Sequence, residues 1–211
     1  MPALAAIALM SEDGDPPPSM TLLGGPIDTR AGPNAVSRFA EAHSLEWFRC
    51  LVYPGFLQLS GFLAMHPDQH FEAHWRMFLH RLTDEAESLA ASRRIYDEYF
   101  AVMNLPAEYY LATIAAVFQQ HLLARRPLRW RGCLVDPGAI ERTALFTIEG
   151  ERDDISGIGQ TRATHALCTR LPAALRRHRE QQGAGHFDLF SGHRFREEVA
   201  PAIKGFIRAN A

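Results

Sequence analysis

The sequence predicts a mixed α/β fold with a parallel sheet that is interrupted by a helical insertion. Two apolar segments indicate the sheet: Met20–Leu23, which ends at a Gly-Gly-Pro turn, and Thr143–Glu149, which is followed by Gly150. The second segment is almost continuously apolar, as expected for a strand covered on both faces. Residues 33–124 lie between them and show helical spacing without a clear strand. An α/β pattern on both sides of a helical block predicts one domain with an insertion.

The remaining elements follow from apolar periodicity and from breaking residues. Pro2–Met10 is apolar on all sides, which predicts a buried helix leading into the sheet. Further helices are expected over residues 160–169 and 194–208, and Pro201 should kink or break the latter. Residues 175–182 occupy the place of a last strand, although their composition is polar. Within the insertion, helical spacing connects Phe71, Trp75, Phe78, Leu79 and Leu82.

Composition and charge exclude several classes of protein. The 211 residues are 47% hydrophobic and 22% charged, with a net charge of −2, which is ordinary for a globular domain. No basic run exceeds Arg125-Arg126 or Arg176-Arg177, so we expect no nucleic-acid partner. The apolar run Ala3–Met10 is shorter than the roughly 20 residues that span a bilayer, so we expect no membrane partner. Cys50, Cys133 and Cys168 have no CxxC spacing, which favours a reducing cytoplasm.

One pair of residues carries the strongest chemical signal. Asp153 follows the apolar strand and the Gly150 turn, and His186 lies 33 residues later in a glycine-rich loop, Gly183-x-Gly185-His186. This order and spacing are those of the acid and the base in an α/β-hydrolase triad. The imidazole would move a proton between nucleophile and leaving group, and the carboxylate would fix its tautomer. The alternative for an Asp after a strand is a turn or helix-capping residue, which is the commoner role.

The nucleophile of such a triad is not evident. The sequence contains no G-x-S-x-G elbow, and Ser60 and Ser191 lack its flanking pattern. Each of the three cysteines is better interpreted as a small buried hydrophobic residue. In chain order the nucleophile should precede the helix that starts at Pro2, so the expectation is that this segment begins just after the elbow.

The chain closely resembles the C-terminal part of the intracellular polyhydroxyalkanoate (polyhydroxybutyrate) depolymerases. The most specific matching runs are GGPIDTR (24–30), YPGFLQL (53–59) and DDISG (153–157), and other matches cover nearly all 211 residues. The resemblance implies an α/β-hydrolase fold with a helical lid, hydrolysis of 3-hydroxyalkanoate ester bonds in storage granules, and a Cys-Asp-His triad. It places the acid at Asp153 and the base at His186, and it implies that the family's cysteine lies upstream of Pro2.

The resulting expectation is a single partial α/β-hydrolase domain over residues 1–211 with a lid at 33–128. It would need no cofactor and would act on a polyhydroxyalkanoate polymer or granule in the cytoplasm. Its N-terminal half is expected to have been lost from this sequence or to be supplied by another chain. The isolated chain is expected to be inactive. The alternative is a non-catalytic remnant that binds granules or a partner.

Other residues offer weaker candidates. Aromatic residues of the insertion, including Tyr53, Phe56 and Trp75, could contact an apolar polyester or simply form the core of the lid. Asp28 could contact substrate, pair with Arg30 or anchor the lid. His66, His70 and His74 have the i, i+4, i+8 spacing of a zinc site, but Pro67 argues against a continuous helix, so no metal site is expected.

Overall fold

A computed structural model provides the structure of the chain. It describes residues 1–49, 52, 53, 55, 60, 68, 71, 72, 75, 78, 79, 101, 103–125 and 127–211; for Val52 and Tyr53 the description covers the main chain. The chain divides into two compact units. Unit 1 combines Met1–Ser44 with Thr113–Ala211, and unit 2 is Leu45–Ala112. Each unit is described by itself.

A three-stranded parallel sheet organises unit 1. The strands are β1 (Ser19–Leu23), β6 (Ala144–Gly150) and β7 (Arg176–Gln181), in the order β1-β6-β7. Every residue of β6 is buried, because this strand has neighbours on both edges and packed layers on both faces. The parallel α/β pattern predicted from the sequence is confirmed. Because the strands are parallel, the loops that follow them gather at one end of the sheet.

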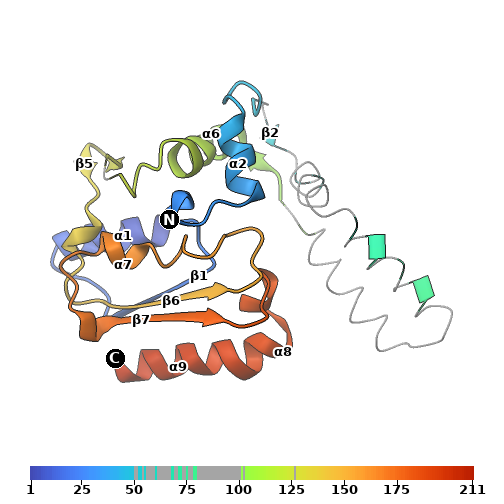
Figure 1. Cartoon of the computed structure of the whole chain (residues 1–211). Helices are drawn as coiled ribbons and strands as arrows, with labels where there is room; N and C mark the ends of the chain where they lie inside the picture. The colour runs from blue at the N-terminus through green and yellow to red at the C-terminus, as the bar shows by residue number, and fades with distance from the viewer. Residues whose placement is uncertain are drawn as a thin grey trace. The chain divides into compact units, whose positions relative to one another are not determined.

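Helices cover both faces of this sheet (Figure 1). On one face lie α1 (Pro2–Glu12) and α7 (Thr164–Leu167), and on the other lies α9 (Ala200–Ala209). Alternation along β6 separates two apolar clusters: Leu145 packs with Leu4 and Leu167, while Phe146 and Ile148 pack with Val199 and Phe206. Burial of each such side chain contributes about 1.5–3 kcal/mol, so these two layers hold the sheet in place.

Strand β7 is polar because it lies at the edge of the sheet, where its arginine side chains interact with main-chain oxygens and an aromatic ring. Arg176 donates to the main-chain oxygens of His165, Cys168 and Leu171 beside α7. On the opposite face the Arg177 guanidinium lies 4.9 Å from the centre of the Phe146 ring. The strand expected at 175–182 is therefore present, and polar edge strands of this kind resist pairing with further chains.

Short elements connect these layers in unit 1. They are η1 (Thr29–Ala31), α2 (Ala35–Ala42), the π-helical turn η2 (Ile114–Gln119), β4 (Arg129–Trp130), β5 (Cys133–Leu134), η3 (Pro137–Ala139), η4 (Ala173–Leu175), η5 (Phe187–Leu189), α8 (Gly192–Arg194) and the π-helical turn η6 (Phe195–Val199). Asn34 and Ser37 form a capping box that starts α2. The Gln119 amide donates to the main-chain oxygens of Ala40 and His43, which ties η2 to the end of α2.

Unit 2 contains an antiparallel pair, β2 (Val52–Tyr53) with β3 (Leu105–Pro106), followed by α6 (Ala107–Thr113), whose last residue belongs to unit 1. Its described residues Phe71, Trp75, Phe78 and Leu79 are helical and exposed, and the Trp75 and Phe78 rings lie 5.5 Å apart. No strand was expected in this region, so β2 and β3 are an addition to the sequence prediction. Among the described residues, no helix is both long and apolar enough to cross a membrane.

Two helices differ from their predicted form. Only Leu4 and Ala8 of α1 are buried, and Met10 is 40% exposed, so the prediction of a helix buried on all sides was wrong. The helix expected over residues 160–169 is limited to α7, because its first residues bond to the loop after β1. Pro201 lies near the start of α9, directly after the π-helical turn η6, which agrees with the expected interruption.

Candidate active site

Asp153 lies in the turn that follows β6 at the carboxyl end of the sheet. Its Oδ1 atom accepts hydrogen bonds from the amides of Ile155 (3.0 Å) and Ser156 (2.7 Å), which closes the loop on the carboxylate. The side chain is fully buried, with 0% of its surface exposed. A buried carboxylate is stable only when its oxygens accept hydrogen bonds, and the two amides satisfy Oδ1.

His186 is the partner of the second carboxylate oxygen of Asp153, Oδ2. Its Nδ1 atom lies 2.8 Å from Asp153 Oδ2, and because a carboxylate accepts, Nδ1 carries the proton. The loop after β7 holds this position: the Gly185 amide donates to Asp188 Oδ2, and η5 begins directly after the histidine. The structure thus brings together the two residues predicted as acid and base.

The geometry leaves Nε2 available for proton transfer. With Nδ1 protonated, Nε2 has the free lone pair that a general base needs. No described residue forms a hydrogen bond with Nε2, and the His186 side chain keeps 19% of its surface exposed. Phe187 and Phe190 flank the imidazole with ring centres 5.7 and 5.2 Å away. The pair can therefore accept a proton from a group that approaches the exposed edge of the ring.

The turn after β1 forms one wall of the pair. Gly24 has φ +47, and a Cβ atom at this position would lie 3.2 Å from Asp153 Oδ2 and 3.2 Å from His186 Cε1. Only glycine combines this left-handed backbone with so close an approach. The hydroxyl of Thr161 holds the next residue by accepting from the Gly25 amide (2.7 Å) and donating to the Gly25 oxygen (2.8 Å). The Gly-Gly-Pro run predicts a turn at Gly24, but no sequence pattern indicates its contact with Asp153 and His186.

A second polar group lies beneath α7. The Thr147 hydroxyl contacts His165 Nε2 at 2.8 Å and His178 Nδ1 at 2.9 Å. Burial lowers the pKa of His165 to about 4, with help from the charges of His178, Arg176 and Arg162, and burial also lowers the pKa of His178. Both rings are therefore neutral near pH 7. This group supports the sheet and forms no described contact with His186.

Asp28 pairs with Arg30, which was one of its expected roles. Asp28 Oδ1 accepts from the Arg30 amide and Nε, and Oδ2 accepts from the guanidinium at 2.8 Å. These hydrogen bonds from Arg30 hold the pKa of Asp28 below its ordinary value. Nearby, the Thr29 hydroxyl contacts the buried His121 at Nδ1 (3.2 Å). The arrangement fixes the η1 turn.

The remaining candidate residues lie in unit 2 or outside the described residues. Tyr53 contributes its main chain to β2, Trp75 is 52% exposed in unit 2, and Phe56 lies outside the described residues. His66, His70 and His74 also lie outside them. In the described part of the chain, no group of three His, Cys, Asp or Glu side chains is arranged to hold a metal ion.

The described cysteines do not resemble an activated nucleophile. Cys168 is fully buried, and that burial raises the pKa of its thiol to about 11. Cys133 is exposed on β5, so the expectation that every cysteine is buried was wrong for this residue. Cys50 lies outside the described residues. Since thiolates are the reactive form, a raised pKa makes Cys168 less reactive than an ordinary cysteine.

A comparison with protein families identifies the family to which this chain belongs. The family model described as PHB de-polymerase C-terminus matches residues 24–211, which is most of the chain. The chain therefore belongs to this C-terminal family of polyhydroxybutyrate depolymerases, and the predicted resemblance is confirmed. Membership relates the chain to polyhydroxyalkanoate degradation and implies a polyhydroxyalkanoate substrate. No curated protein sequence matched the chain in a separate search.

Proposed function

We propose that this chain supplies the acid and the base of a polyhydroxyalkanoate depolymerase, with Asp153 orienting His186. The observation that carries the proposal is the 2.8 Å contact between His186 Nδ1 and the buried Asp153 Oδ2, at the carboxyl end of a parallel sheet. Family membership supplies the substrate class, an ester of a 3-hydroxyalkanoate.

In this proposal His186 Nε2 removes the proton from a nucleophile as the nucleophile attacks the ester carbonyl. Asp153 stabilises the imidazolium that forms. The imidazolium then returns the proton to the leaving alkoxide, which departs as the hydroxyl end of the shortened polymer. Water repeats the sequence: His186 takes its proton, hydroxide adds to the acyl-enzyme, and the freed nucleophile is reprotonated as a 3-hydroxy acid leaves.

The resemblance to the family assigns the nucleophile to a cysteine. Cys168 does not fit, because burial raises the pKa of its thiol, and Cys133 belongs to an exposed hairpin. The proposal therefore leaves the nucleophile to a group that the described residues do not include, on this chain or on a separate one.

The sheet supports a larger α/β-hydrolase fold. The outer edges of β1 and β7 differ: β1 has the sequence SMTLL, and β7 has the sequence RRHREQ. Apolar strands are typical of sheet interiors, and polar strands of edges. We infer that a further parallel strand pairs with β1 in the working enzyme.

Residues 33–128 are proposed to form the lid of this enzyme. The exposed aromatic side chains Phe71 and Trp75 suit contact with an apolar polyester. Tyr53 and Phe56 are proposed as further substrate contacts, and Asp28, through Arg30, as an anchor of the turn that leads into the lid. The location proposed is the surface of storage granules in the cytoplasm.

A non-catalytic granule-binding role is the second candidate. It is favoured by one observation, that no described thiol is suited to act with His186. This role predicts binding to polymer without hydrolysis under any combination of partner segments.

A complementation experiment tests the first proposal. The chain is co-expressed with the N-terminal half of a polyhydroxybutyrate depolymerase, which carries that family's cysteine, and release of 3-hydroxybutyrate from amorphous polymer is measured. We expect hydrolysis with the wild-type chain, and losses of at least about 10³-fold with His186→Ala and Asp153→Ala. His193→Ala, at an exposed histidine, is the matched control. Hydrolysis that survives His186→Ala would refute the assignment.

A further inference from the structure

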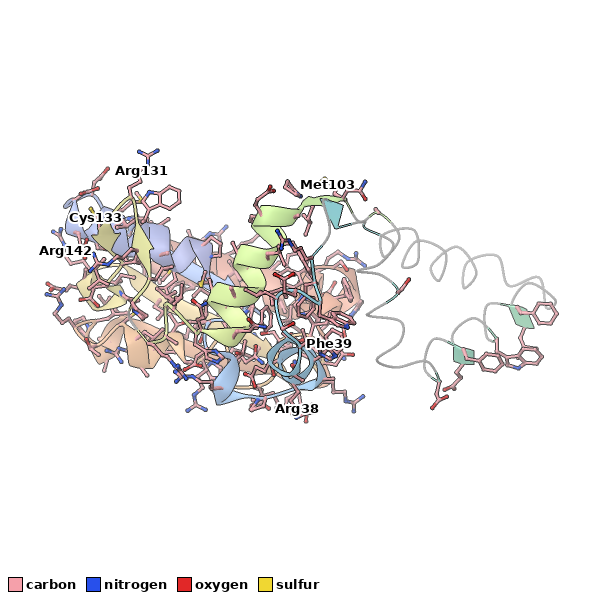
Figure 2. The ribbon with its side chains drawn as sticks, turned by 90° about the horizontal axis from the view of Figure 1, so that it is seen from above. Arg38, Phe39, Met103, Arg131, Cys133 and Arg142 are labelled. Carbon is pink, nitrogen blue, oxygen red and sulfur yellow. The ribbon has the colours of Figure 1, made fainter. Side chains whose placement is uncertain are left out.

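A surface hairpin of unit 1 has no part in the site described above. Strands β4 and β5 pair through Arg129 with Leu134 and Trp130 with Cys133, and Arg131-Gly132 connects them. All six residues are exposed, with Trp130 and Leu134 keeping 60% and 42% of their surface. Figure 2 shows Arg131 and Cys133 at the periphery of unit 1, with the Arg131 side chain directed outward. A tryptophan and a leucine on a hairpin of two-residue strands are solvent-exposed without contributing to a core.

The hairpin lies in a basic stretch of the chain. Between Glu108 and Asp136 the sequence has no acidic residue and four arginines, Arg125, Arg126, Arg129 and Arg131, although the chain as a whole has a net charge of −2. The described arginines of this group form no ion pair with a described carboxylate; Arg129 instead donates to the Gly132 oxygen at 2.8 Å. Their positive charge is therefore available to an anionic partner.

The turn of the hairpin is unusual in sequence. Arg131 has φ 49 and Gly132 has φ 86, so both central residues adopt the left-handed conformation. Asn-Gly and Gly-Gly are the usual sequences for such a turn, and a long side chain at the first position is unfavourable. Among the described residues, the Arg131 side chain forms no hydrogen bond or ion pair and lies 5.7 Å from the centre of the exposed Trp130 ring. A strained backbone at a residue with an exposed side chain indicates a role in binding.

The distribution of side chains over the hairpin identifies the kind of partner. Trp130 and Cys133 lie on one face, and Arg129 and Leu134 on the other, because directly paired residues of antiparallel strands share a face. A rigid protein surface contacts one face, whereas a fluid layer of lipid headgroups surrounds both. Arginine matches phosphate groups, and tryptophan prefers the boundary between headgroups and acyl chains.

We propose that the Arg129–Leu134 hairpin docks the chain on an anionic phospholipid surface. Arg129 and Arg131 bind phosphate groups, and Trp130 and Leu134 enter the boundary with the acyl chains. Such docking needs no spanning helix. It differs from the expectation, drawn from the short apolar run at residues 3–10, that the chain has no membrane partner.

Vesicle sedimentation tests the proposal with the 211-residue chain. We expect binding to vesicles of phosphatidylcholine mixed with phosphatidylglycerol to exceed binding to phosphatidylcholine alone by roughly tenfold or more. High salt should remove most of the difference. Equal binding to both vesicle types would overturn the proposal, as would tighter binding to immobilised polyglutamate than to the anionic vesicles, which would indicate an acidic protein partner.

Substitutions locate the contact. The double variant Arg129→Glu/Arg131→Glu should lower the partition coefficient on anionic vesicles by about tenfold or more, and Trp130→Ala by several-fold. Trp47→Ala is the matched control, since Trp47 is also 60% exposed but lies near Arg49, which pairs with Glu46 at 3.2 Å. Circular dichroism checks that each variant folds. If Trp47→Ala weakens binding as much as Trp130→Ala, the hairpin is not the docking site.

Discussion

Asp153 uses its two carboxylate oxygens for two different purposes, one toward its own loop and one toward His186. Oδ1 accepts from the amides of Ile155 and Ser156, and Oδ2 accepts from His186 Nδ1 at 2.8 Å. Asp153 thus closes its own turn and also contacts the histidine. The two loop amides orient the carboxylate that accepts from the imidazole, so the imidazole is held by a group with hydrogen-bond partners of its own.

The first prediction concerns Asp153→Asn. The amide oxygen can still accept from Ile155 and Ser156, but the amide nitrogen would face the Nδ1 proton of His186, so the imidazole should change tautomer or turn away. We expect a folded protein that lacks the downfield Nδ1 proton resonance of His186 in NMR spectra.

Asp153→Ala is the comparison for this first prediction. It removes all three hydrogen bonds and should lower the free energy of unfolding by about 3 kcal/mol, as measured by urea denaturation. Persistence of the downfield resonance in Asp153→Asn would contradict the assigned contact.

The second prediction concerns the wall of the site. Gly24→Ala places a methyl group 3.1 Å from Leu189 Cδ1 and 3.2 Å from Asp153 Oδ2, in addition to left-handed backbone strain. We expect a loss of about 2–4 kcal/mol in the free energy of unfolding and a shifted His186 imidazole resonance.

Gly14→Ala separates strain from contact in this second prediction. Gly14 also has a positive φ, +85, but a Cβ atom there would meet nothing within 4 Å. This variant should lose only about 1–2 kcal/mol and leave the resonance unchanged. Equal effects of the two substitutions would mean that the Gly24 contact is unimportant.

The sequence predicted the centre of the fold better than its connections. Strand β6 and the positions of Asp153 and His186 follow from local pattern: an apolar run, a glycine turn and a glycine-rich loop. Strand β7 is harder to predict, because its polar side chains are compensated by partners far along the chain, such as Glu198 for Arg179. A local pattern cannot report such partners.

The same limit explains the shortened α7 and the missed wall residues. Residues 160 and 161 belong to the predicted helix, but their groups bond to the loop after β1: the Gln160 main-chain oxygen accepts from the Asp28 amide, and the Thr161 hydroxyl bonds to Gly25. The side-chain amide of Gln160 also donates to the main-chain oxygen of Gly32. These contacts join segments more than 120 residues apart, and tertiary bonds of this kind override local propensity.

The third prediction follows from that connection. Thr161→Val keeps the shape of a fully buried side chain but removes both hydrogen bonds to Gly25. The Gly25 amide loses its partner, whereas the Gly25 oxygen still accepts from the Ile27 amide. We expect a loss of about 2–3 kcal/mol in the free energy of unfolding. Thr169→Val, at an exposed threonine, should change it by less than about 0.5 kcal/mol. A neutral Thr161→Val would show that the two loops are held by other contacts.

The fourth prediction is a dependence of stability on pH that arises beneath α7. The Thr147 hydroxyl has one proton, so it donates to one of His165 and His178 and accepts from the other, and the ring nitrogen that accepts must be unprotonated for this arrangement to persist. Burial lowers the pKa of His165 from 6.5 to about 4 in the folded chain. Between these two values the unfolded chain binds more protons than the folded chain. The free energy of unfolding is therefore unaffected above pH 6.5 and falls as the pH is lowered toward 4.

The size of this fall and its source can be measured together. The full shift would correspond to about 3 kcal/mol, and partial exposure of the ring reduces the expected loss to about 1–2 kcal/mol. Urea denaturation at about pH 7.5 and about pH 5 should reveal it. His165→Gln should reduce the dependence because the amide does not titrate, with the remainder due to His178, whose pKa burial also lowers. His193→Gln, at an exposed histidine, should leave it unchanged. If His165→Gln retains the full dependence, the titrating group lies elsewhere.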